Sequence, residues 1–215
     1  MAQVQTIGQV MKVQRSQGQM TSQALSPILA QRINQLKVSY GETIEEYLVA
    51  VNPSTQLEVC QNERDCYLGE FPTLGLLRTA YGKEAATMWL LPQLYNLSEY
   101  CGVKNKLEGT PLLECASIIG NVYHYLKVSE LMLFFYKFKA GKYGRFYGNV
   151  DPMIITSSLQ LFCRERNDFW FKYDSEQREK EMEESRKNVV TYDEYCKRKG
   201  IEPKKEIQSF ISQNK

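Results

Sequence analysis

The sequence contains a single histidine, His124, among its 215 residues. Because histidine is the usual activator of serine and cysteine nucleophiles and a common metal ligand, such chemistry would depend on this one residue. It lies in "NVYHYLKV", between two tyrosines of a predicted core helix, where we expect a partly buried structural histidine. The patterns Gly-x-Ser-x-Gly, His-Glu-x-x-His and Gly-x-Gly-x-x-Gly are also absent. We therefore expect no enzymatic activity and assign no catalytic residue.

Long apolar runs and a cysteine framework are missing as well. No run approaches about 18 consecutive apolar residues, and the Gln-rich N-terminus lacks the apolar centre of a signal peptide. We therefore expect a cytoplasmic protein with no membrane contact. The six cysteines are scattered, and the closest pair, Cys60 and Cys66, is separated by five residues where zinc sites usually have two to four. We expect reduced thiols, no metal site and no cofactor.

Acidic residues are absent from the beginning of the chain, where the first is Glu42. The basic residues before it are Lys12, Arg15, Arg32 and Lys37. The first forty residues therefore carry a charge of about +4, which could contact phosphates. A solvated, flexible end of the chain explains the same composition.

Start and stop signals of helices occur along most of the chain. Ser26 followed by Pro27 predicts an N-cap with proline at the first helical position, and Thr43 with Glu46 forms a capping-box pattern. Asp151 begins the last long helix in the same way. Alternating β-branched residues with tight Asn-Gly or Asp-Gly turns are absent. The sequence therefore predicts an all-α protein, an irregular multi-helix body with an extended charged C-terminal helical arm.

Composition divides the chain into four predicted segments. These are a flexible, Gln-rich, basic N-terminal segment (1–25), N-terminal helices with a loop (26–70), a helical body (71–171), and a charged helical arm with a small terminal helix (172–215). The mixture of Pro, Ser, Asn and charged residues from Asn52 to Glu70 indicates the loop. In the body, we expect Thr110 and Ser129 to cap two helices.

The predicted arm begins near Asp174, where the apolar pattern gives way to alternating charges around Met182. Such a helix stands in water and is held by ion pairs between residues four apart. A break at Asn188 to Val190 precedes a last amphipathic segment with Ile207 and Phe210 on one face. Since so short a helix cannot bury its apolar face alone, the arm could dock on a protein partner or on a second copy.

One stretch combines rings, cations and glycines. "FFYKFKAGKYGRFYGNVDP", residues 134–152, contains seven aromatic side chains, four basic side chains and three glycines. Glycine permits positive φ and close approach, exposed rings can stack on bases, and cations can contact phosphates. The candidate nucleic-acid-binding residues are Lys139, Lys142, Tyr143, Arg145, Phe146 and Tyr147. The alternative interpretation is that this turn only packs two helices together.

The segment from Glu130 to Arg166 resembles one found in uncharacterised all-helical proteins of Bacteroidetes genomes, their phages and mobile elements. The shared pattern is Glu-Leu, a Lys-x-Gly-x-Tyr-Gly turn, an aromatic residue, an Asp, and a helix that ends near Glu-Arg. This family has no established activity, so the resemblance implies no role for any residue. Its setting implies, by association, a role around replication or DNA transfer, such as an adaptor or a helicase-loader-like helper.

Two functions are therefore expected. The first is a non-enzymatic accessory protein that contacts nucleic acid through the turn and is associated with replication or mobile elements. The alternative is a protein–protein adaptor that uses the C-terminal arm.

Overall fold

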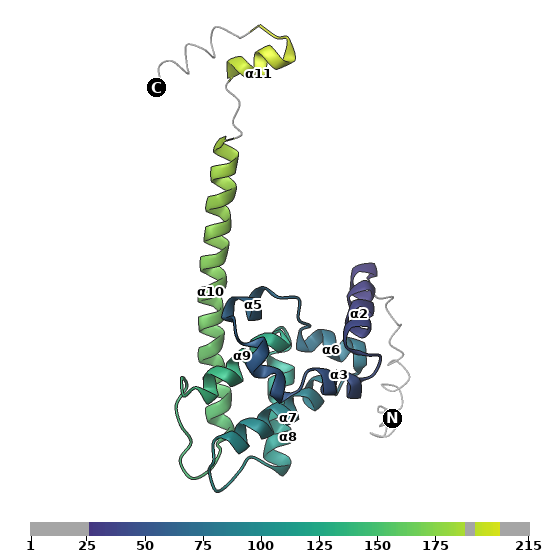
Figure 1. Cartoon of the computed structure of the whole chain (residues 1–215), viewed down its shortest axis with the longest axis vertical. Coiled ribbons are helices and arrows are strands. Elements are labelled where there is room, and N and C mark those ends of the chain that lie inside the picture. Colours follow the sequence, from purple (N-terminus) through teal and green to yellow (C-terminus); the bar gives the residue numbers. More distant parts are fainter. Residues whose placement is uncertain (1–25, 188–191, 203–215) are drawn as a thin grey trace, which may run out of the picture. The chain divides into compact units, whose positions relative to one another are not determined.

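The computed structural model describes residues 26–187 and 192–202. These residues form helices joined by turns and loops, which confirms the predicted all-α fold (Figure 1). The strand-like pairing among them is limited to two isolated bridges, Thr73 with Lys127 and Asn105 with Asn149. A membrane-crossing helix would need a length and an apolar content that none of these described helices combines. The boundary between two compact units falls after Leu159.

The first two helices begin where their capping residues predict. In α2 (Pro27–Tyr40), the Ser26 hydroxyl accepts a hydrogen bond from the Leu29 amide at 3.3 Å. In α3 (Ile44–Ala50), Thr43 and Glu46 exchange hydrogen bonds of 3.1 and 3.3 Å between side chain and backbone. Each cap satisfies amides that a helix start otherwise leaves without partners.

The prediction of a loop from Asn52 to Glu70 is wrong. The segment contains three short elements, η1 (Pro53–Thr55), α4 (Gln56–Val59) and α5 (Glu63–Leu68). Its asparagines are helix caps, since the Asn52 and Asn62 side chains accept hydrogen bonds from backbone amides two residues later. Elements this short carry no hydrophobic period and are stabilised by tertiary packing, so their sequence resembles that of a loop.

Helices α6 (Leu74–Tyr81), α7 (Ala85–Tyr100) and α8 (Gly109–Val122) form the next part of the first unit. Helices α7 and α8 lie side by side (Figure 1). Trp89 of α7 is fully buried and donates from Nε1 to the Val51 carbonyl at 2.8 Å, which ties this helix to the end of α3.

Two predictions about α8 are wrong. The helix begins at Gly109 after Glu108, so Thr110 is not its cap. It ends at Val122, so His124 lies in the following turn and its side chain is exposed. The backbone carbonyl of His124 accepts the Gly75 amide at 2.8 Å. His124 therefore has a structural role through its backbone, without the predicted burial of its ring.

Helix α9 (Val128–Lys139) is the most deeply buried helix of the first unit. Every residue from Val128 to Phe135 is buried. Ser129 is not its cap, in contrast to the prediction. The Glu130 carboxylate instead accepts the Lys127 amide at 2.9 Å, which closes the first turn from within the helix.

The start of α9 satisfies the carbonyl groups at the end of α5. The Ser129 hydroxyl donates to the Cys66 carbonyl at 2.7 Å. The Lys127 ammonium donates to the carbonyls of Tyr67 and Gly69 at 2.7 and 2.9 Å. A cation at a helix C-terminus also interacts favourably with the helix dipole. These bonds explain why Ser129 is buried rather than placed at a cap.

Helix α10 (Pro152–Lys187) begins as predicted, because the Asp151 carboxylate accepts the Met153 amide at 2.8 Å. In its last turns Lys187 pairs with Glu183 at 2.8 Å, one of the expected ion pairs four residues apart. Helix α11 (Tyr192–Lys199) is followed by Gly200, which has a φ of 65°. The predicted break at residues 188–190 and the helix with Ile207 and Phe210 lie outside the described residues.

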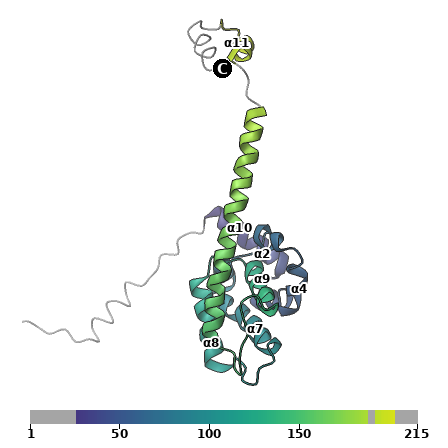
Figure 2. The same ribbon diagram turned by 90° about the vertical axis from the view of Figure 1, so that its left-hand side faces the viewer.

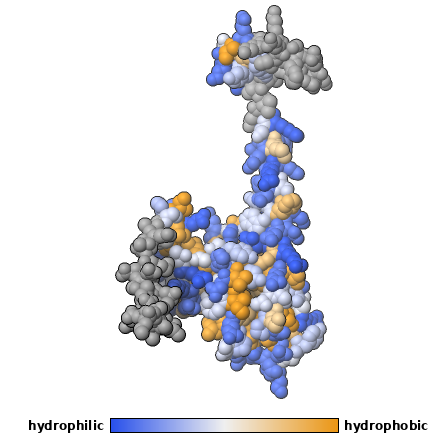
Figure 3. Space-filling model, turned by 180° about the vertical axis from the view of Figure 1, so that it is seen from behind, coloured by the Kyte–Doolittle hydropathy of each residue, from blue (hydrophilic) through white to orange (hydrophobic). Residues whose placement is uncertain are grey.

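The surface seen in Figure 3 is mostly hydrophilic, and its hydrophobic side chains are gathered in small, separate areas. Exposed apolar side chains in this pattern are normal for a folded chain and do not by themselves indicate a partner.

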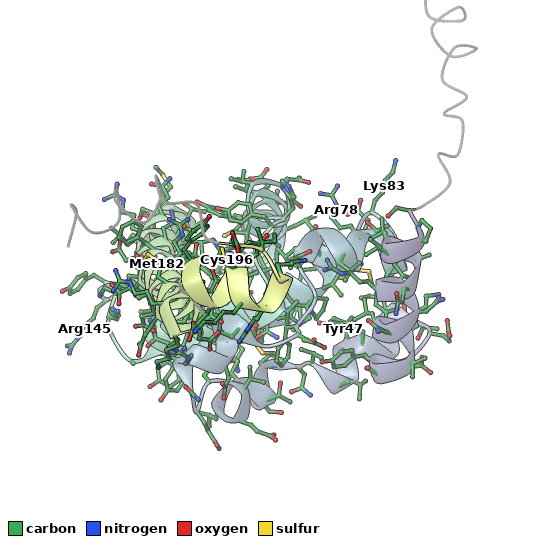
Figure 4. All side chains as sticks on the ribbon, turned by 90° about the horizontal axis from the view of Figure 1, so that it is seen from above. Tyr47, Arg78, Lys83, Arg145, Met182 and Cys196 are labelled. Carbon is green, nitrogen blue, oxygen red and sulfur yellow. The ribbon has the colours of Figure 1, made fainter. Side chains whose placement is uncertain are left out.

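A cluster of tyrosines joins α2, α3 and α6. The ring of Tyr47 (labelled in Figure 4) is fully buried. It lies 5.3 Å from the ring of Tyr40 and 5.8 Å from that of Tyr81. The Tyr81 hydroxyl donates to the Gly41 carbonyl at 2.8 Å. The Tyr47 hydroxyl has no hydrogen-bond partner among the described residues. A buried polar atom without a partner reduces stability, whereas the ring around it contributes to the core.

We expect Tyr47→Phe to leave the free energy of unfolding unchanged or to raise it by about 1 kcal/mol, because an unsatisfied hydroxyl is removed. Tyr47→Ala should lower it by about 3–5 kcal/mol, because the whole ring is lost. Urea denaturation measures both changes. A loss of stability in Tyr47→Phe would contradict the assignment of an unsatisfied hydroxyl.

The same residue predicts a pH dependence. Burial raises the pKa of Tyr47 well above its usual 10.0, and the neighbouring Tyr40 and Tyr81 raise it further. The unfolded chain then releases this proton more readily than the folded one, so stability is complete below pH 10.0 and falls as pH rises beyond it. Tyr47→Phe should lose less stability than the wild type in this alkaline range, as measured by thermal denaturation at increasing pH.

Candidate nucleic-acid interface

The turn between α9 and α10 contains three glycines in the left-handed region. Their φ angles are 83° for Gly141, 104° for Gly144 and 80° for Gly148, so the positive φ expected from the sequence is confirmed. A Cβ added at any of these positions would meet no atom within 4 Å. The backbone conformation, rather than lack of space, therefore requires glycine here.

The inner side of this turn is hydrophobic. Phe146 is buried and stacks on Phe138 of α9, with ring centroids 5.3 Å apart and planes at 19°. The half-buried Tyr143 lies 5.6 Å from the ring of Phe134 and 6.1 Å from that of Phe138. These two candidate residues fix the turn against α9, as the packing interpretation expects.

Lys139 is also engaged within the protein. It is half-buried, and its ammonium donates to the side-chain oxygens of Gln56, at 2.7 Å, and of Asn96. It lies 5.8 Å from the centre of the Tyr100 ring, within the range of a cation–π contact. Burial lowers the pKa of Lys139, while the thiols of Cys101 and Cys60 act in the opposite direction. Lys139 thus connects α9 to α4 and α7.

The outer side of the turn carries the remaining candidates, Lys142, Arg145 and Tyr147. All three residues are exposed, and Tyr147 keeps 86% of its surface accessible. In Figure 4 the Arg145 side chain points away from the first unit. The turn therefore separates its six candidates into an inner group that packs and an outer group that faces solvent.

Tertiary structure adds a residue that the sequence analysis missed. The Asn105 amide donates to the Gly148 carbonyl at 3.2 Å, and the Val150 amide donates to the Asn105 carbonyl at 3.0 Å. This bridge brings the exposed Lys104 beside the turn. The two segments are far apart in the chain, and "GVKNKLEG" has no pattern that links it to the turn. Only the folded structure could identify Lys104 as a candidate.

Neighbouring charges modify this surface. Lys106 forms an ion pair with Glu99, and this hydrogen bond raises the pKa of Lys106. The Asp151 carboxylate caps α10 and places a negative charge where the turn meets this helix. An anion at the start of α10 would compete with Asp151 for backbone amides. The exposed side chains, rather than the helix start, are therefore the available contacts.

The four basic residues among the first forty fall only partly within the described part of the chain. Lys12 and Arg15 lie outside the described residues. Lys37 pairs with Glu42 at 3.0 Å, so part of its charge is compensated.

Residues 110–206 match the model of a family described as a family of unknown function (DUF6633). The matched segment includes α8 from its second residue, α9, the turn and α10, and thus all six candidates from the sequence, but not Lys104. This agrees with the expectation of an uncharacterised protein. Comparisons with curated proteins and with solved structures found no match.

The division of the turn predicts that two alanine substitutions differ in their effect on the free energy of unfolding. Phe146→Ala should lower the free energy of unfolding by about 3 kcal/mol, because a stacked, buried ring is lost. Tyr147→Ala should change it by less than about 0.5 kcal/mol, because the ring is exposed. Denaturant titration of both variants is the measurement. Equal effects of the two substitutions would contradict the inner and outer assignment.

Proposed function

We propose that the protein is a non-enzymatic accessory protein that contacts nucleic acid through Lys104, Lys142, Arg145 and Tyr147. These four residues are called the basic face below. The observation that carries the proposal is the exposed Tyr147 ring, on a turn that also carries the exposed Lys142 and Arg145 and is anchored to α9 and to Asn105.

Each part of the basic face suits single-stranded nucleic acid. An exposed aromatic ring can stack on a base, and such contacts contribute about 1–3 kcal/mol per base with little dependence on sequence. Arg and Lys side chains neutralise phosphates and make binding depend on salt. A duplex hides its base faces, so Tyr147 could contribute little there. We therefore favour single strands over duplexes.

The anchoring of the turn supports the proposal. Phe146 is anchored on α9, and the bridge to Asn105 holds the other end of the turn. A surface that is already ordered loses less conformational entropy when a ligand binds. The packing interpretation and the binding proposal are thus compatible, because the inner residues hold the outer ones in place.

The setting of the resembling proteins in phages and mobile elements supports a role around replication or DNA transfer in the cytoplasm. This support is associative, whereas contact with nucleic acid is argued from the basic face itself.

The first test is a charge reversal with a matched control. Arg145→Glu and Lys104→Glu should each weaken binding to a fluorescently labelled oligo-dT at low salt, and together by about tenfold or more. Lys83→Glu makes the same charge change at an exposed lysine on the opposite side of the first unit (Figure 4). It should leave binding nearly unchanged. Fluorescence anisotropy at several salt concentrations measures the affinities.

Other results would reject the proposal. These are no binding by the wild type, or an equal loss in Lys83→Glu, which would indicate a general effect of net charge. Tyr147→Ala should weaken binding to oligo-dT more than binding to a duplex. Tyr147→Phe keeps the ring and should bind oligo-dT as the wild type does. Stronger binding to the duplex by the wild type would exclude the stacking role.

The second candidate function is a protein–protein adaptor that uses the arm. Phe171, just before the charged part of α10, and Met182, within it, are 76% and 54% exposed. They are separated by three helical turns and so lie on the same side of the helix. A helix with an apolar side of this kind can pair with another helix, either of a partner or of a second copy.

Light scattering tests self-association. If the arm pairs two copies, the wild type should exceed 25.0 kDa in a concentration-dependent way, and Phe171→Glu with Met182→Glu should return it to this mass. Met153→Glu, at an exposed methionine of the first unit, is the matched control and should leave the larger mass unchanged. Deletion of residues 188–215 shows whether the last segment contributes. A wild type of 25.0 kDa at all concentrations excludes self-association.

A further inference from the structure

Cys60 and Cys66 form a buried pair of thiols. Cys60 follows the last residue of α4, and Cys66 lies in α5. Their exposed fractions are 6% and 0%. The Cys66 thiol donates to the carbonyl of Val59, the residue before Cys60, at 3.3 Å, and the two thiols are hydrogen-bonded to each other. None of the six cysteines forms a disulfide, and Cys60 and Cys66 are the two that share a hydrogen bond.

The pair lies between two elements that hold α9. Helices α4 and α5 both pack against α9, and Figure 2 shows α4 beside it. Gln56 of α4 accepts a hydrogen bond from Lys139, and Glu63 of α5 forms an ion pair with Lys137. A covalent bond between the cysteines would therefore join the two short helices that hold the last turn of α9.

The two sulfurs differ in their readiness to ionise. The hydrogen bond from Cys60 lowers the pKa of Cys66, and burial and the carboxylates of Glu63 and Asp65 oppose this shift. The same hydrogen bond, together with burial, raises the pKa of Cys60. Lys137 favours the thiolate at both positions. Because the thiolate is the nucleophile, Cys66 is the sulfur expected to react first, in molecules where local opening of the short helices α4 and α5 admits the oxidant to this buried pair.

We propose that Cys60 and Cys66 form a reversible intramolecular disulfide when the protein is exposed to a hydroperoxide. This inference is independent of the proposed contact with nucleic acid. It differs from the expectation of six thiols without a role.

The reaction with hydrogen peroxide is balanced in two steps. The Cys66 thiolate attacks one peroxide oxygen, the O–O bond breaks, and a sulfenic acid and hydroxide are formed. The Cys60 sulfur then attacks the Cys66 sulfur as its own proton is transferred, the S–O bond breaks, and water leaves. In total, two thiols lose two electrons and two protons, and one peroxide becomes two waters. A thiol reductant reverses the reaction through a mixed disulfide.

The experiment uses the reduced full-length protein and hydrogen peroxide. After exposure, the protein is denatured in N-ethylmaleimide and its intact mass is measured. Alkylation should fall from six thiols to four, with a loss of two hydrogen atoms. Trypsin cleaves after Arg64, between the cysteines, so the product should yield two peptides joined through Cys60 and Cys66. Dithiothreitol should separate them.

Matched variants identify the pair. Cys101→Ser removes a half-buried thiol outside the pair and should preserve the linked peptides. Cys60→Ser should abolish them and leave Cys66 as a sulfenic acid that dimedone traps. The cross-link in the wild type is itself informative if a variant folds poorly. Oxidation of Cys66 to a sulfinic acid without a cross-link, or linkage of either cysteine to a different partner, would overturn the proposal.

Discussion

The burial of helix α9 is the constraint on which the rest of the first unit depends. A helix that is apolar around its first turns must be covered on every side, because water would otherwise contact its leucines and phenylalanines. Helix α7 contributes to this cover, and the short helices α4 and α5 also pack against α9. Four- and six-residue helices are not stable alone in water. Their presence in a segment that resembles a loop follows from the need to cover α9.

Polar groups at both ends of α9 make this arrangement specific. At its start, Lys127 and Ser129 satisfy carbonyls at the end of α5. At its end, Lys137 and Lys139 reach Glu63 of α5 and Gln56 of α4. Hydrophobic burial alone would tolerate several positions of a short helix, whereas these directional bonds select one. Lysines near a helix end can thus serve packing, even in a sequence that suggests phosphate contacts.

The turn after α9 follows from the same principle. Phe146 continues the hydrophobic cluster of α9 outside the helix, and the three glycines supply the backbone angles that allow the chain to reverse. Anchoring the inner rings forces the intervening side chains outward. Arg145 and Tyr147 are exposed because Phe146 between them is buried. Alternating residues of the turn thus form the contact with α9 and the solvent-facing surface.

The sequence by itself determined the helical class, the caps at Ser26, Thr43 and Asp151, and the glycine-rich turn, because these depend on interactions between residues close together in the chain. Only the tertiary structure decided which lysines face solvent, since Lys139 and Lys142 belong to one short motif but differ in their distant neighbours. It also brought Lys104 to the turn through Asn105 and placed Cys60 against Cys66. Contacts of this kind are determined by packing between elements, and no local pattern records them.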